Sequence, residues 1–333
     1  MAPTAGFLAA WDDVIRCARD AHFAFRSDYL EWEGRHERPA RAVLLAEGAR
    51  KGALLLRPAG HGWACGHPWR CGAVVSRGVT GAGPLDLHRD DAEWLFRQAE
   101  TIAEGARLRM YLPIEPPRGI PGYLAGFSVY QDVRADDETM LRSMSSSKRD
   151  MVRRAKRRGY TIRAAAGVDE LREYNELEMR ARRARGEHVA DHEHEVPPPG
   201  LGWRQWELPW MWLMLALRDG RIASGAGDSV GPGWSLEARA AASTLEARRD
   251  GAFALLCFEE ARRARDAGLH WLNHGGDTVF KREISGTLGR RVPMWCWLTG
   301  GAIWRLPNEA EAALARVRRV IARRRRPLRL RPA

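Results

Sequence analysis

The sequence contains one order of elements twice: a strand hairpin, then a helix, then a strand. Apolar runs at 42–46 and 53–57 flank a glycine-containing loop in the first half, and runs at 210–217 and 222–225 flank an Asp-Gly loop in the second. Such loops between apolar runs are typical of β-hairpins. Two copies of this order predict an α/β (α+β) fold, in which helices flank a mixed central sheet.

A helix and a strand are expected after each hairpin. Apolar residues recur at helical spacing in both helices, and Gly105 and Gly268 follow as expected left-handed C-caps. The helices are expected at 91–104 and 252–267, and the strands at 108–112 and 269–273. A final helix is expected over about 309–324, with Asn308 as its N-cap and Glu311 completing a capping box.

The repeated order places a domain boundary near the middle of the chain. Four prolines interrupt the sequence between positions 113 and 121, before an expected strand at 127–133. Proline ends regular elements because its ring fixes the backbone and removes a donor. We therefore expect two domains, an N-terminal one at 1–128 and a C-terminal one at 129–333 that carries the chemically interesting motifs.

The composition favours a partner with many negative charges. The chain has 333 residues, is 45% hydrophobic and contains 14 Trp, so it can bury sizeable cores. Its 54 basic residues exceed its 42 acidic ones, which gives a net charge of +12. Such an excess favours nucleic acid, an anionic membrane surface or a phosphate-rich substrate.

The sequence indicates a cytoplasmic protein without a membrane-inserted segment. No apolar run reaches the length of about 18 residues that a membrane span requires, and the N-terminus has no secretory signal. The five Cys form no CxxC motif, which suits a reducing compartment. Cys65 and Cys71 could ligate a metal together with His61 and His67, but no second cluster has zinc-site spacing. We expect no metal, no bound cofactor and a monomer.

The segment 275–281, Gly-Gly-Asp-Thr-Val-Phe-Lys, follows an apolar strand and ends at Lys281. The chain has 50 Arg but only four Lys, so a Lys here is unusual. Its ammonium is a compact point charge with three donors, whereas Arg presents a rigid fork. A point charge suits stabilisation of a small oxyanion in a reaction centre. The alternative is a surface cation at a strand end.

A strongly basic helix is expected at 145–158, with serines at its start and Gly159 after its end. Lys148 and Arg149 fall in its first turn, where cations oppose the helix dipole. A bound anion would offset this cost, so we expect phosphate contacts. The alternative is a solvated basic face. The candidate phosphate-binding residues are Lys148, Arg149, Arg153, Arg154, Lys156 and Arg157.

The segment 187–195 contains His188 and His192 and is followed by three prolines. It resembles a metal site in spacing, but a solvated loop is favoured, and a lid with a His as general base is the sharper alternative. Trp210 and Trp212 lie just beyond, where aromatic clusters usually form core or pocket wall. We assign His188, His192, Trp210 and Trp212, together with Asp277, to an acceptor pocket.

Two of these segments resemble the FemABX-like proteins, which belong to the Gcn5-related N-acyltransferase (GNAT) superfamily. The segment 145–159 is similar to the family's S-x-K/R-x-x-I/V-R-R-A-x-R-x-G run. The segment 261–281 is similar to its run of Ala, Gly, apolar strand, Gly-Gly and Phe-Lys, and 286–293 to the continuation. The resemblance covers residues 130–300 by motif and residues 1–125 by element order.

The resemblance implies tandem GNAT-like domains and transfer of an acyl group to an amine. The donor would be an aminoacyl-tRNA, and the acceptor a small-molecule or peptidoglycan-precursor amine, as in peptide or natural-product biosynthesis. Phe280 and Lys281 match the family's Phe-Lys pair near the tRNA 3′ end. The role implied for Lys281 is to neutralise the tetrahedral oxyanion or to position the terminal ribose.

Two other functions stay open. The acyl-CoA branch of the superfamily carries R/Q-x-x-G-x-G/A before a helix, and the nearest match at 248–253 ends in Phe253 and contains Asp250, which repels phosphate. This departure weakens an acyl-CoA-dependent N-acyltransferase. A non-catalytic nucleic-acid-binding protein would suit the charge, but simple binding does not require the Phe-Lys element.

Overall fold

The computed structural model describes residues 4–18, 21–36, 41–68, 70–77, 80–82, 85–184, 186, 209–231, 235–300 and 302–324. They form two compact units, each discontinuous in sequence. Unit 1 comprises Met1–Arg38 with Ser128–Arg291, and unit 2 comprises Pro39–Phe127 with Val292–Ala333. The continuous domains 1–128 and 129–333 stay a prediction.

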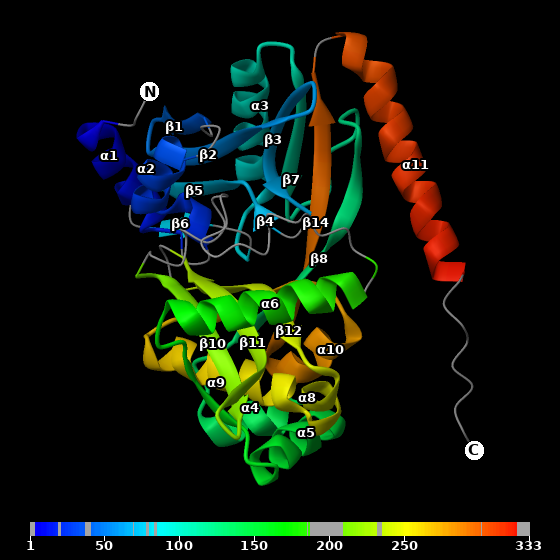
Figure 1. Cartoon of the computed structure of the whole chain (residues 1–333). Helices are drawn as coiled ribbons and strands as arrows, with labels where there is room; N and C mark the ends of the chain where they lie inside the picture. The colour runs from blue at the N-terminus through cyan, green and yellow to red at the C-terminus, as the bar shows by residue number, and fades with distance from the viewer. Residues whose placement is uncertain are drawn as a thin grey trace. The chain divides into compact units, whose positions relative to one another are not determined.

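Unit 2 contains the first copy of the predicted order. Its elements are β1 (Arg41–Glu47), β2 (Arg50–Ala59), β3 (Gly62–His67), β4 (Arg70–Cys71), β5 (Ala73–Arg77), β6 (Thr80–Ala82), α3 (Arg89–Ala103), β7 (Arg107–Leu112), the start of β8 (Gly122–Asp132), the end of β14 (Gly289–Thr299), the short helix η5 (Ala302–Trp304) and α11 (Arg305–Arg324). The β1–β2 hairpin is confirmed: Glu47 pairs with Arg50 across a two-residue turn in which Gly48 has φ +58°. α3 follows β6 and leads into β7, which pairs in parallel with β3 (Figure 1).

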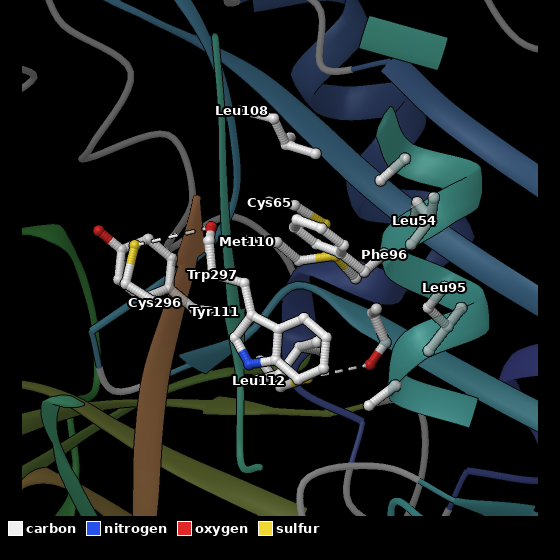
Figure 2. Close-up of a cluster of buried hydrophobic side chains, with 14 of the residues drawn as sticks. Leu54, Cys65, Leu95, Phe96, Leu108, Met110, Tyr111, Leu112, Cys296 and Trp297 are labelled. Carbon is white, nitrogen blue, oxygen red and sulfur yellow. Dashed lines mark hydrogen bonds between the residues drawn. The ribbon is translucent and has the colours of Figure 1, made fainter. Parts of the chain in front are cut away.

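The core of unit 2 lies between α3 and its sheet. Leu95 and Phe96 of α3 are buried against Leu54 of β2, Met110 of β7 and Trp297 of β14, all labelled in Figure 2. Burying large aromatic and aliphatic side chains in this way is the main source of folding free energy. The indole N–H of Trp297 donates to the backbone oxygen of Ile114 at 2.7 Å, so the buried donor is satisfied.

The last helix begins one turn earlier than predicted. α11 starts at Arg305, so Asn308 lies inside the helix and the predicted N-cap there is wrong. The buried Asn308 side chain accepts a hydrogen bond from Arg107 Nε at 2.8 Å. The Glu311 carboxylate pairs with Arg107 and Arg109. A tertiary polar network therefore uses the two residues that the capping-box pattern singled out.

Unit 1 contains the second copy. Its elements are α1 (Ala5–Ile15), the short helix η1 (Phe23–Phe25), α2 (Ser27–His36), the end of β8, α4 (Asp137–Ser143), α5 (Ser146–Arg157), β9 (Thr161–Ala164), α6 (Val168–Ala184), β10 (Met211–Arg218), β11 (Arg221–Val230), β12 (Ser235–Ser243), α8 (Leu245–Asp250), α9 (Ala252–Asp266), β13 (Trp271–Gly276), α10 (Val279–Ser285), the short helix η4 (Gly286–Leu288) and the start of β14. The β10–β11 hairpin is confirmed, with Asp219 and Gly220 in the left-handed conformation.

The sheet of unit 1 runs in the order β8-β13-β12-β11-β10-β9. β12 and β13 pair in parallel, and the chain between them forms α8 and α9. Met214 and Ala216 of β10 share a buried cluster with residues of α9, whereas Leu213, Leu215 and Leu217 share one with residues of α6. Helices thus flank both faces of a mixed sheet, as predicted. Within the described residues, no helix combines the length and apolar character needed to cross a bilayer.

Candidate functional site

The segment after β13 fixes Lys281 in the first turn of α10. Thr278 caps this helix, and its hydroxyl accepts a hydrogen bond from the Lys281 backbone N–H at 3.2 Å. The carboxylate of Asp277 accepts from Arg282 at 2.6 Å and from Arg291 at 2.8 Å. Asp277 therefore braces the turn with both oxygens, and its assignment to an acceptor pocket stays a prediction.

The Lys281 side chain is half-buried, and desolvation lowers the pKa of its ammonium. The thiol of Cys257 on α9 and the carboxylate of Asp277 favour the charged form. Across the described part of the chain, no carboxylate lies within ion-pair distance of Lys281. Partial removal of a cation from water without a paired anion is unfavourable. The site therefore favours a ligand that brings negative charge to Lys281.

His274, at the end of β13, is a neutral neighbour of Lys281. Burial lowers the pKa of its imidazole to about 3, and the positive charge of Lys281 acts in the same direction. Its Nε2 lies 2.9 Å from Oε1 of Gln131. Asn273 accepts from the Gly275 backbone N–H at 2.8 Å and shapes the turn, where Gly275 has φ +74°. His274 was not among the site residues predicted from the sequence.

Phe280 joins three separate features of the sequence. Its ring stacks on Phe253, with centroids 5.3 Å apart. The ammonium of Lys148 lies 5.0 Å from the Phe280 ring centroid and pairs with Glu283 at 3.2 Å. Three features of the sequence therefore meet at Phe280. They are the basic helix α5, the Phe-Lys pair, and Phe253, the residue that departs from the acyl-CoA motif.

The first-turn cations of α5 are used inside unit 1. Lys148 is buried against α10, as described above. The guanidinium of Arg149 donates to the backbone oxygens of Arg142 at 2.9 Å and Met144 at 2.6 Å. These contacts satisfy carbonyls at the end of α4. A phosphate role for Lys148 and Arg149 stays a prediction, and both residues already have a structural role.

The other cations of α5 lie nearer the solvent. Lys156 pairs with Glu259 at 3.6 Å, and Arg154 donates to the backbone oxygen of Asp250 at 3.3 Å. Arg153 forms an exposed pair with Asp150 at 3.7 Å. Arg157 is exposed and forms no ion pair with the described residues. Arg153 and Arg157 are therefore the α5 cations best placed to meet an external anion.

The start of α9 is covered by protein groups. Gly251 has φ +88°, and a Cβ there would lie 2.6 Å from the backbone oxygen of Met151 in α5. The carboxylate of Asp250 accepts from Tyr160 at 3.2 Å and from Arg218 at 3.1 Å. A pyrophosphate needs free backbone N–H groups at a helix start. Here α5, Asp250 and the ring of Phe253 occupy the surroundings of that start.

The two described tryptophans of the predicted acceptor pocket differ in environment. Trp210 is buried, and its indole N–H donates to Asp28 at 2.8 Å, so it anchors the N-terminal segment of unit 1. Trp212 is partly exposed and lies under the guanidinium of Arg263, 4.3 Å from the ring centroid. His188 and His192 lie outside the described residues. The acceptor assignment stays a prediction.

A buried pair of carboxyl groups was missed by the sequence analysis. Asp228 of β11 and Glu260 of α9 are both almost inaccessible to solvent. Burial raises the pKa of each, so both carboxyl groups favour the neutral form. Cys257, Glu260 and Arg263 follow each other on one face of α9 at a spacing of three residues. No cluster of three or more His, Cys, Asp or Glu placed to hold a metal occurs within the described ranges.

The fold is one that other solved structures share. The crystal structure of FemX covers 92% of this chain, matched over 99% of its own length, with a TM-score of 0.63 and 14% identity. The structure of L-PGS from Bacillus licheniformis covers 96% of this chain and is matched over 97% of its own length, with a TM-score of 0.54 and 13% identity.

A third structure has the same fold. The C-terminal domain of a putative lysylphosphatidylglycerol synthetase from Agrobacterium fabrum covers 85% of this chain and is matched over 88% of its own length, with a TM-score of 0.53 and 16% identity. No protein-family model and no curated protein matches the sequence. These similarities confirm the predicted resemblance to FemABX-like proteins at the level of the fold. Sequence identities this low show a shared fold and nothing about function.

Proposed function

We propose that the protein is an acyltransferase that uses an aminoacyl-tRNA donor and forms an amide bond on a small-molecule or peptidoglycan-precursor amine. The observation that carries this proposal is Lys281, a half-buried cation without a carboxylate partner in the described chain, in the first turn of α10 after β13. A shared fold with FemX and with lysylphosphatidylglycerol synthetases supports a transferase of this kind.

The proposed reaction is aminolysis of an ester. The acceptor amine attacks the carbonyl carbon of the aminoacyl ester, a C–N bond forms, and the carbonyl oxygen becomes an oxyanion. Lys281 stabilises this charge from a desolvated position, where electrostatic attraction is stronger than in water. Collapse of the intermediate breaks the ester C–O bond. The ribose oxygen leaves as a hydroxyl after taking up the proton that the amine releases.

Asp277 and Thr278 act as positioning residues in this scheme. Asp277 holds Arg282 and Arg291, and Thr278 caps the backbone of Lys281. These contacts fix the first turn of α10 before substrate binds. Such preorganisation means that the ammonium does not have to reorient as the oxyanion forms. Phe280 contributes through its ring stack with Phe253 rather than through a reactive atom.

The donor is tested by sensitivity to ribonuclease. We expect the protein, incubated with a mixture of charged tRNAs and candidate amines, to form amide products that mass spectrometry detects. Ribonuclease added beforehand is expected to remove these products, whereas ribonuclease added after the reaction leaves them. Product that survives prior digestion of the RNA would contradict the proposal. Binding of charged tRNA without any product would favour the non-catalytic alternative.

Acetyl-CoA provides a second test. We expect no saturable heat in calorimetry at millimolar acetyl-CoA, because Met151, Asp250 and Phe253 surround the helix start that would hold its pyrophosphate. Restoring the motif by Phe253→Gly also leaves α5 against Gly251, so binding is still not expected. Micromolar affinity in the native protein would move the acyl-CoA-dependent alternative ahead of the tRNA-dependent one.

The outward cations of α5 give a prediction for tRNA affinity. Arg153→Gln with Arg157→Gln is expected to weaken tRNA binding uniformly across tRNA species, and to lower the slope of log K against log salt by about 1.5 for two lost phosphate contacts. Filter binding at several salt concentrations measures both. Arg172→Gln, an exposed α6 arginine that pairs with Asp169, is the matched control. An unchanged slope would exclude these two residues from the tRNA surface.

A further inference from the structure

A pocket of about 420 Å³ opens in unit 1 beyond the end of strand β9. The short strand β9 stops at Ala164, so the start of β10 beyond it forms one wall, and the start of α6 forms another. Among the described lining residues, the side chains are apolar except for that of Arg263. The lining residues are Ala164, Ala165, Ala166, Gly167, Val168, Leu171, Pro209, Met211, Trp212, Leu213 and Arg263.

Arg263 is held in place without an ion pair. Its guanidinium carbon lies 4.3 Å from the ring centroid of Trp212, and its Nη1 donates to the sulfur of Met214 at 2.7 Å. Among the described residues, no carboxylate accepts a hydrogen bond from it. A guanidinium has five N–H donors, and a thioether is a weak acceptor, so most of its donor capacity is unused. Its planar fork is suited to a two-point contact with a carboxylate.

The nearest acid does not neutralise Arg263. Asp228 is the register partner of Trp212 across the β10–β11 ladder, and its charge favours protonated Arg263. The carboxyl of Asp228 is completely buried, and within the described residues neither of its oxygens has a hydrogen-bond partner. Burial favours the neutral form of this acid. The positive charge at the pocket wall therefore stays largely uncompensated.

We propose that this pocket binds a small monocarboxylate with an apolar body. The carboxylate contacts the guanidinium of Arg263, and the apolar body packs against Trp212, Met211 and Leu171. A single guanidinium matches a single negative charge, whereas a doubly charged phosphate would bring an unpaired charge into an apolar wall. The pocket volume is in the range of small-molecule sites.

The proposed site is separate from the Lys281 site. Arg263 lies six residues beyond Cys257, the α9 neighbour of Lys281, which corresponds to about 9 Å along the helix axis. The completely buried pair of Asp228 and Glu260 lies between them. The inference therefore goes beyond the proposed transfer reaction and does not depend on the identity of the donor.

The test compares phenylpropionate with its isosteric amide, phenylpropionamide, by calorimetry on the full chain. We expect saturable binding of the carboxylate. The amide is expected to bind at least about ten-fold more weakly, because the charge-assisted contact is lost. Arg263→Gln is expected to reduce affinity for the carboxylate by a similar factor. Arg265→Gln, on the same turn of α9 but paired with Asp137 and Asp266, is expected to keep it.

A second variant, Gly167→Phe, tests the pocket even if Arg263→Gln does not fold. Gly167 lies at the pocket wall, and a Cβ there would meet no atom within 4 Å. Gly167→Phe is therefore expected to obstruct the pocket, leave the thermal unfolding midpoint unchanged and abolish carboxylate binding with Arg263 intact. Equal affinity for carboxylate and amide, binding of inorganic phosphate as tight as that of phenylpropionate, or full binding by Gly167→Phe would each overturn the proposal.

Discussion

Replacement of Lys281 by methionine is expected to reduce amide formation by about 10²- to 10³-fold, the range found when one donor to an oxyanion is removed. Methionine keeps the apolar stem and removes only the charge. Because the ammonium is desolvated and lacks an ion pair with the described carboxylates, its loss is expected to leave the free energy of unfolding unchanged or higher. Single-turnover kinetics with charged tRNA and thermal unfolding measure the two effects.

The comparison of rate with affinity separates two roles of Lys281. If the ammonium acts on the oxyanion, the affinity for charged tRNA changes little while the chemical step slows. If Lys281 anchors the terminal ribose or a phosphate, affinity falls as much as the rate does. Lys51→Met is the matched control, because Lys51 is an exposed lysine of β2 that is not among the candidate phosphate-binding residues. An unchanged rate in Lys281→Met would remove this residue from the mechanism.

Local sequence rules predicted the elements whose ends are set by turn chemistry. The β1–β2 and β10–β11 hairpins follow from loops in which Gly48, Asp219 and Gly220 adopt positive φ. The helix α9 is followed by the expected glycine, Gly268, with positive φ, whereas after α3 the left-handed C-cap is Glu104 and the expected Gly105 comes next, also with positive φ. These features depend on a few neighbouring residues, so a single sequence contains enough information to place them.

Other features depend on residues that are distant in sequence and could not be predicted from local patterns. Asn308 has the pattern of an N-cap, but its hydrogen bond with Arg107 belongs to a network across about 200 residues, and the helix begins at Arg305 instead. The burial of Lys148 likewise depends on Glu283 and Phe280 of α10. The sequence shows that α5 carries many basic side chains, but only the tertiary fold determines which of these side chains face the solvent.

The candidate site also contains some residues that a local pattern predicts and others that only the tertiary structure brings together. The Phe-Lys pair was recognised because its spacing after a strand and two glycines is local. His274 could have been flagged, because it lies in the same segment, directly before those glycines. Asp228 and Glu260 gave no such signal: they lie on β11 and α9 and meet only when the helix packs on the sheet. Pairs of this kind require a structure.

Glu260→Gln is expected to change how stability depends on pH. Burial raises the pKa of Glu260 from 4.5 to about 8 in the folded protein. A raised folded-state pKa means that folding favours proton uptake, so the stabilising contribution is complete below the unfolded pKa and is lost as pH rises toward the folded value. Each proton of difference corresponds to a slope of about 1.4 kcal/mol per pH unit.

The variant isolates this contribution because glutamine keeps the shape of the protonated acid and cannot ionise. We expect chemical denaturation between pH 5 and about 8 to show that the native protein loses stability relative to Glu260→Gln as pH rises, so the variant is the more stable protein at the alkaline end. All other titrating groups are common to both proteins, and Asp228→Asn is expected to reproduce the trend because burial also raises the pKa of Asp228. Parallel pH profiles for native protein and variant would show that Glu260 is ionised in the folded state, which would require a cation beside it.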